Sequence, residues 1–366
     1  MPRPSIDYGP PDAGAASGLR QAWNLPSHPR PIVIIGAGGI VRTAHLPAYH
    51  RLNFPVAGLY DIRRDAAEET ARRFAVPKIF SDLDEASRFT AAVFDVAVPG
   101  DQILGVLQRL PQGAPVLIQK PMGENLAAAR QILAVCRERE LVAALNFQLR
   151  FSPNVLALRD LIARDGLGEI VDLEVRLVVK QPWQQWSFLK GAPRLEILYH
   201  SIHYLDTIRA IAGEPRGVYC RAVAHPALPE FRDTRSTTIL DYGESLRCSL
   251  MLNHTHDHDG THRESMLKVE GTKGAALLTM GVNLDYPDGG PDRLEVTLGQ
   301  GGWTPVPLRG SWFTEAFEGP MSNLQRFIAG EDADLVSPVD DAIKTMALVE
   351  ACYQSSAAGG APIREN

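Results

Sequence analysis

Cysteine is scarce in this sequence. Its 366 residues include four cysteines, Cys136, Cys220, Cys248 and Cys352, and no two of them form a CxxC pair. So few and scattered cysteines argue against a disulfide-stapled scaffold, and the lack of a CxxC pair argues against a zinc knuckle. We therefore expect buried thiols in a reducing compartment, the cytoplasm.

Long apolar runs and an excess of positive charge are also absent. No segment approaches the ~18 apolar residues of a membrane-spanning helix. Residues 1–30 are rich in Pro, Gly, Ala and Ser, hold no signal-peptide core and are expected to form a surface-draped arm. The formal charge of −6 provides no electrostatic reason for nucleic acid or an anionic membrane to be a partner.

The stretch from Pro31 to Arg150 alternates short apolar runs with helical patterns. Single cores stop growing at roughly 250–300 residues, so a chain of this length should form two domains. The apolar runs predict strands at 31–35, 56–61, 78–80, 92–99, 115–121 and 141–148. Helical spacing predicts helices at 40–52, 64–74, 103–110 and 125–140. This alternation predicts a parallel sheet covered on both faces, which is a Rossmann-type α/β domain at 31–150.

After Arg150 the pattern changes to longer strands with partial alternation. We expect a helix at 153–164, a strand at 169–179, a helix at 196–212, extended runs within 217–281, and closing helices at 312–329 and 338–357. Period-two alternation is typical of an antiparallel sheet with one face packed on helices. Residues 151–366 should therefore form an α+β domain with a large, mainly antiparallel open sheet.

A glycine-rich turn, GAGG at 36–39, joins the first predicted strand to the first predicted helix. Glycines there permit a tight turn, let the backbone approach a pyrophosphate, and leave helix N–H groups pointing at negative charge. Val41 occupies the third glycine position of the GxGxxG fingerprint, which is therefore imperfect. The strand before the turn and the helix after it favour dinucleotide binding.

Asp61 lies about twenty residues beyond this turn, at the end of the second predicted strand. An acidic side chain there can accept hydrogen bonds from the ribose hydroxyls and repels a 2′-phosphate, so NAD is favoured over NADP. Arg63 and Arg64 follow closely and weaken that preference, because an arginine could accommodate the extra phosphate.

Several landmarks occur in order beyond residue 31: GAGGIVRTAHLPA at 36–48, the strand-end Pro99, QKP at 119–121, RFSP at 150–153, SIHYLD at 201–206 and EGTKGA at 270–275. In these the chain resembles the glucose–fructose oxidoreductase and inositol dehydrogenase group, the Gfo/Idh/MocA family. The resemblance implies a Rossmann domain and an open-sheet domain used for substrate binding and for assembly as a homodimer or homotetramer. It also implies hydride transfer between NAD(P) and a sugar, cyclitol or related polyol.

The resemblance further implies a cofactor site and an active-site lysine. The expected cofactor contacts are Gly36, Ala37, Gly38, Gly39, Ile40, Asp61, Ile62, Arg63, Val98, Pro99, Gln119, Lys120 and Gln148. Lys120 ends the fifth predicted strand, where open α/β sheets place ligands, and Pro121 restricts its backbone. In the family this lysine belongs to an EKP motif that touches the nicotinamide and the substrate hydroxyl, whereas Gln119 replaces the glutamate here. We expect Lys120 to steady a developing alkoxide.

The predicted helix at 196–212 carries Glu196, Tyr199, His200, His203 and Asp206 at spacings of three and four, so much of this set shares one face. The resemblance makes His203 the catalytic base, and the ordinary imidazole pKa near ~6.5 suits proton exchange. The family has an aspartate at the position of Tyr199, and a neutral tyrosine cannot stabilise an imidazolium as a carboxylate does. Tyr199, His200 or Glu196 could take that part, and the roles of His203 and Lys120 could be reversed.

Candidate substrate contacts complete the prediction: Arg150, Trp183, Trp186, Tyr199 and His200. Indoles in the loop at 180–186 can stack on the apolar faces of sugar rings, although one of the two could be core. The run NHTHDHDGTH at 253–262 is dense in histidine, but no cysteine or carboxylate cluster completes a tight site, so no metal is expected.

Three functions are compatible with these features. The first is NAD-dependent oxidation of a secondary hydroxyl in a sugar, cyclitol or related polyol. The second is an NAD-retaining enzyme that oxidises a ring hydroxyl transiently to permit glycoside cleavage or elimination. The third is a non-catalytic NAD-binding sensor. This function stays possible because the aspartate that the family has near its catalytic histidine is missing beside His203. Net production of NADH separates the first from the second.

Overall fold

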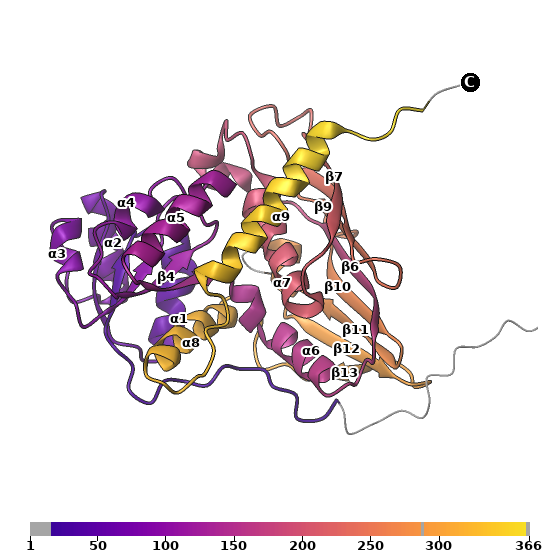
Figure 1. Ribbon diagram of the computed structural model, residues 1–366, viewed down its shortest axis with the longest axis horizontal. Helices are drawn as coiled ribbons and strands as arrows, with labels where there is room; N and C mark the ends of the chain where they lie inside the picture. Colours follow the sequence, from indigo (N-terminus) through magenta and orange to yellow (C-terminus); the bar gives the residue numbers. More distant parts are fainter. Residues whose placement is uncertain (1–15, 287–288, 364–366) are drawn as a thin grey trace, which may run out of the picture. The chain divides into compact units, whose positions relative to one another are not determined.

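The computed structural model describes residues 16–286 and 289–363 and divides the chain into two compact units (Figure 1). The Rossmann unit consists of Ala22–Ser152 and Trp312–Ala347. The sheet unit consists of Pro153–Ser311 with the described residues up to Gln21 and from Leu348 onward. Residues 1–15 of the predicted arm lie outside the described residues. Segment 312–347 thus departs from the contiguous domains expected at 31–150 and 151–366.

The Rossmann unit contains a five-stranded sheet in the order β2-β1-β3-β4-β5, and each neighbouring pair is parallel. Its strands are β1 (Ile32–Ile35), β2 (Val56–Tyr60), β3 (Val93–Val96), β4 (Pro115–Gln119) and β5 (Val142–Asn146). The chain leaves β1 for β2 on one side and returns to β3 on the other. In such sheets ligands bind beyond the carboxyl ends of the strands at this switch point.

Local sequence explains most helices of this unit. They are α1 (Leu46–Arg51), α2 (Arg64–Phe74), α3 (Leu83–Ser87), α4 (Ile103–Leu107), α5 (Leu126–Glu138) and α8 (Glu318–Ile328). The Asn125 side chain caps α5 by accepting a hydrogen bond from the Ala128 N–H at 2.9 Å. The helix predicted at 40–52 is split into a π-helical turn at Val41–His45 and α1. The strand predicted at 78–80 forms only an isolated bridge between Leu59 and Ile79.

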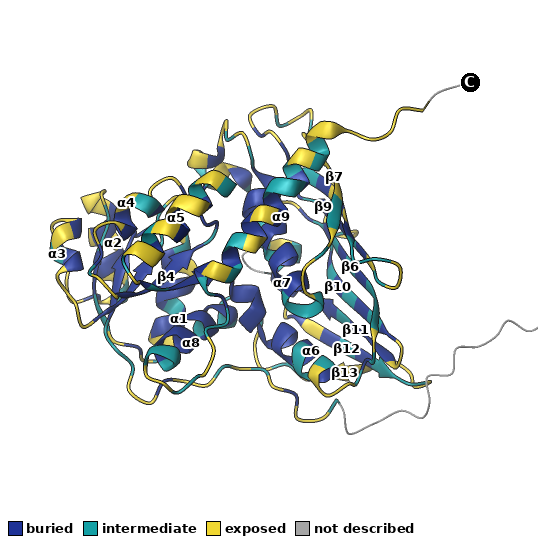
Figure 2. Ribbon diagram, in the orientation of Figure 1, coloured by how far each residue is buried: buried dark blue, intermediate teal, exposed yellow. Residues whose placement is uncertain are grey.

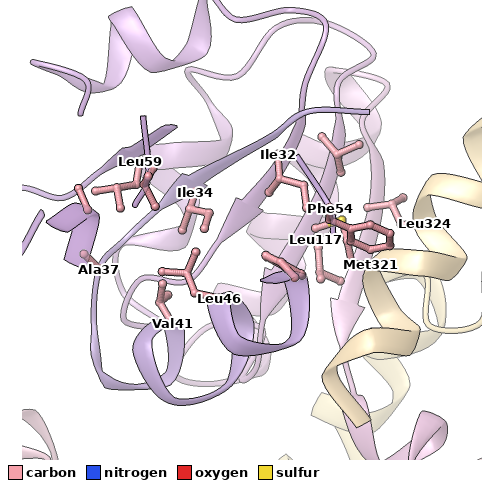
Figure 3. Close-up of a cluster of buried hydrophobic side chains, with 14 of the residues drawn as sticks. Ile32, Ile34, Ala37, Val41, Leu46, Phe54, Leu59, Leu117, Met321 and Leu324 are labelled. Carbon is pink, nitrogen blue, oxygen red and sulfur yellow. The ribbon is translucent and has the colours of Figure 1, made fainter. Parts of the chain in front are cut away.

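The core of the Rossmann unit shows why segment 312–347 belongs to it. Met321 and Leu324 of α8 are fully buried and pack in the same cluster as Ile32 of β1 and Leu117 of β4 (Figure 3). Burial of a side chain of this size contributes about 1.5–3 kcal/mol. The apolar face of α8 therefore joins this core although more than 150 residues separate it from β5.

The sheet unit contains an eight-stranded sheet in the order β13-β12-β11-β10-β6-β9-β8-β7, with the β6–β9 pair parallel and the others antiparallel. Its strands are β6 (Ile170–Val178), β7 (Gly217–Val223), β8 (Arg235–Asp241), β9 (Arg247–Asn253), β10 (Glu264–Gly271), β11 (Gly274–Thr279), β12 (Arg293–Leu298) and β13 (Thr304–Val306). The last two strands were not predicted. The predicted fold class, a Rossmann domain followed by a larger, mainly antiparallel sheet, is confirmed.

One face of the larger sheet packs on helices. In the sheet unit α6 (Pro153–Ala163) contacts β11 and α7 (Ile202–Ala212) contacts β6, and the end of α9 (Val339–Ala358) bonds to β7 through Ser355 and Ser356. Burial alternates along β8 and β9, so these strands present a buried and an exposed face. Buried and intermediate residues alternate in the same way along β6 and β10 (Figure 2). The outer face exposes Tyr219, Ile239 and Met251. Among the described helices none is both long enough and apolar enough to span a membrane.

Candidate functional site

The glycine turn follows β1 at the carboxyl edge of the Rossmann sheet. Gly36 has φ of +108°, and a Cβ added there would lie 2.3 Å from the Ala97 carbonyl oxygen, so only glycine fits. A Cβ added to Gly38 or Gly39 would meet nothing within 4 Å. The backbone over these two residues is therefore open to a ligand, as close approach of a pyrophosphate requires.

Asp61 follows β2 and closes the same turn. Its carboxylate accepts hydrogen bonds from the Ala37 N–H at 2.7 Å and from the Arg63 N–H at 2.8 Å. The Ile62 side chain next to it is 89% exposed. Arg64 pairs with Glu68 at 2.9 Å on the exposed surface of α2. An open glycine backbone beside a fixed carboxylate fits the dinucleotide predicted for this turn.

Lys120 stands directly after β4, at the same carboxyl edge of the sheet. The Lys120–Pro121 peptide bond is cis, and the side chain of Gln119 accepts a hydrogen bond from the Lys120 N–H at 3.3 Å. Lys120 is half-buried, and burial lowers the pKa of its ammonium group to about 8. At neutral pH the side chain is therefore mostly protonated, yet it can lose its proton within about one pH unit of neutrality.

Two buried amide oxygens lie at the end of β5. Asn146 pairs with Gln119 across the β4–β5 ladder, and Gln148 follows in a short 3-10 turn. Asn146 Oδ1 and Gln148 Oε1 are buried and have no hydrogen-bond partner among residues 16–286 and 289–363. Buried acceptors of this kind call for a donor, which a bound ligand can provide. Val98 and Pro99 end β3 at the same edge, half-buried and exposed respectively.

Arg150, a predicted substrate contact, is buried in the Rossmann unit. Its guanidinium donates hydrogen bonds to the Val336 carbonyl at 2.8 Å and to the Asp341 carboxylate at 2.7 Å. These bonds fasten the end of β5 to the segment that follows α8. The arrangement favours an anchoring role for Arg150 over direct substrate contact.

A buried polar network in the same unit escaped the sequence-based prediction. Asp95 of β3 accepts hydrogen bonds from Tyr49 at 2.8 Å and from His45 Nδ1 at 2.8 Å, and His45 Nε2 lies 3.3 Å from Asn146 Nδ2. All four side chains are buried. The network ties the helix after the glycine turn to the strand that carries Asn146. Its one signal in the sequence is an aspartate within an apolar strand, VFDV.

The histidine helix of the sheet unit begins with a π-helical turn, Ile197–Ser201, and continues as α7. Tyr199 is buried and packs edge-on against Phe188, with ring centroids 5.9 Å apart. His200 and His203 are half-buried. The two histidine side chains are therefore more accessible to solvent than the Tyr199 side chain.

Trp183 is corrected from a substrate contact to a core residue. It is fully buried, and its ring packs against His200, His254 and Phe231 with centroids 4.6, 5.5 and 6.2 Å away. No ring face is left for a sugar. Trp186 is half-buried and lies 6.4 Å from the Tyr286 ring, so it stays the candidate for stacking.

The histidine-rich run separates into two environments. His254 is buried just after β9, with Nε2 3.3 Å from Glu196 Oε1. His256 is half-buried and His258 is exposed, and their ring centroids are 5.7 Å apart. Within the described part of the chain no group of three or more His, Cys, Asp or Glu side chains could hold a metal ion. The buried Glu196–His254 pair was not foreseen from sequence.

Comparison with known families decides the relationship. The family described as an oxidoreductase family with an NAD-binding Rossmann fold matches residues 30–147, and the GFO/IDH/MocA C-terminal domain matches residues 155–277. The chain belongs to the GFO/IDH/MocA family. The predicted resemblance is thereby confirmed.

Individual relatives within the GFO/IDH/MocA family are distant. The chain is 28% identical over 220 residues to trans-1,2-dihydrobenzene-1,2-diol dehydrogenase of Sus scrofa, covering 58% of this chain and 62% of that protein. It is 22% identical over 338 residues to inositol 2-dehydrogenase of Rhizobium meliloti, covering 88% and 96%. The chain thus spans under two thirds of the length of the pig enzyme.

Solved structures agree in fold. An oxidoreductase from Agrobacterium radiobacter, solved with NAD+, L-tartaric acid and magnesium, has a TM-score of 0.74 at 19% identity over 90% of this chain and 97% of that one. The aldose-aldose oxidoreductase of Caulobacter crescentus, solved with glycerol, has a TM-score of 0.76 at 16% identity over 91% and 99%. At these identities the GFO/IDH/MocA likeness establishes the fold alone.

Proposed function

We propose that this protein is an NAD-dependent dehydrogenase acting on a secondary hydroxyl of a sugar, cyclitol or related polyol. One observation carries the proposal: the open glycine turn and the half-buried Lys120 lie at the same carboxyl edge of the Rossmann sheet. The names of two relatives, inositol 2-dehydrogenase and trans-1,2-dihydrobenzene-1,2-diol dehydrogenase, both denote enzymes of ring alcohols and support this substrate class.

The residues of the glycine turn would hold the dinucleotide. Gly38 and Gly39 would present open backbone to the pyrophosphate, Asp61 would accept hydrogen bonds from the ribose, and the exposed Ile62 would offer an apolar surface to the adenine, while Gly36 permits the turn itself. Bound NAD would supply the acceptor for the electron pair that leaves the substrate carbon. Asp61 would repel a 2′-phosphate, so we propose NAD over NADP.

Lys120 and His203 would have different roles at the substrate hydroxyl group. Lys120, protonated below about pH 8, would donate to the substrate oxygen and stabilise negative charge as the hydroxyl proton leaves. His203 is half-buried on α7, and an imidazole accepts a proton readily near neutral pH. We assign His203 the proton relay, with Tyr199 and His200 as its neighbours on the same helix, and Trp186 the stacking contact with the substrate ring.

We also propose that copies of the chain assemble through the outer face of the eight-stranded sheet. Exposed large apolar side chains on β7, β8 and β9, namely Tyr219, Ile239 and Met251, support this face as a homodimer or homotetramer interface. The four cysteines are buried thiols, which supports the proposal of a reducing compartment, the cytoplasm.

The deciding experiment follows NAD reduction by absorbance across a panel of sugars, cyclitols and their glycosides. We expect sustained reduction with one substrate class, because the residues described above suit net oxidation of a ring hydroxyl. Lys120→Met should abolish most of this signal while NAD still binds.

Two outcomes would contradict the proposal. Tight NAD binding without net reduction, but with cleavage or elimination of a glycoside, would favour the NAD-retaining enzyme. Tight NAD binding with no turnover of any panel member, and none in the reverse direction with ketones and NADH, would favour the sensor.

A further inference from the structure

Glu196 is a fully buried carboxylate at the start of the histidine helix. Its Oε1 accepts a hydrogen bond from the Ser201 hydroxyl at 2.7 Å and lies 3.3 Å from His254 Nε2. Its Oε2 has no hydrogen-bond partner in the part of the chain that the structure describes. An isolated buried charge is costly, so a carboxylate persists here only through the partners on Oε1.

The hydrogen bonds of His254 indicate which of its ring nitrogens carries a proton. The ring is buried, and Nδ1 has no hydrogen-bond partner among the described residues. A second proton on Nδ1 would leave a buried donor unsatisfied, which costs more than keeping that nitrogen bare. The geometry therefore fits a ring proton on Nε2 that is directed at Glu196.

The π-helical turn and the His254 ring link Glu196 to His200. In a π turn, residues five apart come together, which explains the contact between Glu196 and Ser201. His200, one residue earlier, packs its ring against His254 with centroids 4.5 Å apart and against Trp183 with centroids 4.6 Å apart. His200 is half-buried, so it is the accessible end of an otherwise buried cluster.

We propose that Glu196, together with His254, is a positioning residue for His200. The pair holds the His200 ring against Trp183 and favours its protonated form, on the same helix that carries His203. The consequence for catalysis rests on the proposed function, whereas the effect on His200 itself does not.

Other titratable groups pack around the cluster, and one of them, Asp233, gains its negative charge near neutral pH. They are Tyr199 and His203 on the same helix, Asp233 before β8, Tyr353 on α9 and Arg194, which pairs with Glu350. Asp233 accepts hydrogen bonds from the Leu195 and Glu196 N–H groups, and burial together with the charge of Glu196 raises its pKa to about 7. Below that pH Asp233 is mostly neutral, and Glu196 is the main negative charge of the cluster.

The test is a histidine titration of the full-length protein by NMR, between about pH 5 and 9. The chain has ten histidines, so the His200 signal is assigned by its loss in His200→Asn. Glu196→Gln preserves the shape and removes the charge, and it should lower the midpoint of the His200 titration by about one pH unit, a tenfold loss of proton affinity. Glu264→Gln removes one charge from an exposed pair with Arg176 and should leave the midpoint unchanged.

A second variant covers the case in which Glu196→Gln fails to fold. His254→Gln keeps an amide donor for Glu196 but removes the ring that packs on His200, so the midpoint should fall by only a few tenths of a unit. An unchanged His200 midpoint in a folded Glu196→Gln protein, or in His254→Gln, would overturn the inference.

Activity separates the two proposals. If Glu196→Gln shifts the midpoint of the His200 titration but the wild-type protein oxidises no substrate, the proposed function is wrong and the effect on His200 still holds. A shifted midpoint with an unchanged pH profile of kcat/KM would overturn the catalytic consequence while the dehydrogenase stands.

Discussion

The glycine turn and the histidine helix differ in what builds them. At the turn the backbone makes the site: Gly36 adopts a positive φ, Gly38 leaves open space, and Asp61 is fastened by the N–H groups of Ala37 and Arg63. At the helix, side chains from separate segments converge. Trp183, Asp233 and His254 surround residues 196–201. The first region should therefore be sensitive to backbone substitutions and the second to charge and ring substitutions.

The largest effect is expected from Lys120→Met, which changes a side chain at the same edge of the sheet as the glycine turn. Loss of a group that steadies charge or moves a proton costs about 10²–10⁴-fold in rate. We expect kcat/KM to fall by that factor while the dissociation constant for NAD changes only a few-fold. Lys78→Met, an exposed lysine of the same unit paired with Glu85, is the control. Unaltered turnover in Lys120→Met would refute the assigned role.

A double variant tests whether Lys120 and His203 act in the same step. Lys120→Met combined with His203→Asn should cost less than the product of the two single effects if both residues serve one proton-transfer step. Strictly multiplicative effects would instead assign the two residues to separate steps. Steady-state kinetics of the four proteins in the cycle measure the coupling.

Gly36→Ala should break the glycine turn through the backbone. The new Cβ would lie 2.3 Å from the Ala97 oxygen and φ of +108° disfavours alanine, so we expect the free energy of unfolding to fall by about 2–5 kcal/mol. Gly38→Ala has open space and should stay within about 0.5 kcal/mol of wild type, yet weaken NAD binding. Urea denaturation compares the three proteins. Equal stability of both variants would contradict the packing described for Gly36.

Asp61→Ala tests the side chain to which we assign the preference for NAD over NADP. Loss of charged hydrogen bonds to the ribose costs about 1.5–3 kcal/mol, or roughly 10–100-fold in kcat/KM with NAD. Activity with NADP should rise, because repulsion of the 2′-phosphate is removed. Asp65→Ala, on the exposed first turn of α2, is the matched control. A ratio of NAD to NADP activity that does not change would remove the basis for the cofactor preference.

The pH profile should reveal the smallest effect and decide between Lys120 and His203. Lys120 loses its proton as pH rises through about 8. If its positive charge is needed, kcat/KM falls by about tenfold per pH unit above that value. This falling limb should be absent from the residual activity of Lys120→Met. A limb that rises through pH 8 instead would make Lys120 the base and reverse the assigned roles.

Several parts of the site were predictable because they depend on neighbours along the chain. A strand, glycines and a helix in sequence define the dinucleotide turn, and Asp61 follows from the length of the unit between β1 and β2. Lys120 could be placed at the edge of the sheet because a parallel strand ends where its apolar run ends. The strands β12 and β13 were missed, since their alternation is short and mixed with polar residues.

Other parts were out of reach because side-chain environments depend on residues distant in sequence. Trp183 and Trp186 are three residues apart, yet one is fully buried beneath Phe231 and His254 and the other is half-buried. The position of Arg150 after β5 predicted a contact with substrate, but its guanidinium donates hydrogen bonds to the Val336 carbonyl and the Asp341 carboxylate. No spacing rule connects positions that far apart.

The sequence by itself determined the two kinds of sheet, the glycine turn, the acidic residue beside it and the lysine at the strand end. These follow from hydrophobic periodicity and backbone conformation, which act over a few residues. Only the tertiary structure decided that α8 completes the Rossmann core, that Trp183 is buried, and that Glu196 and His254 form a buried hydrogen-bonded pair in contact with His200. Burial and the pairing of buried polar groups are properties of segments brought together by folding, so they appear only when the chain is packed.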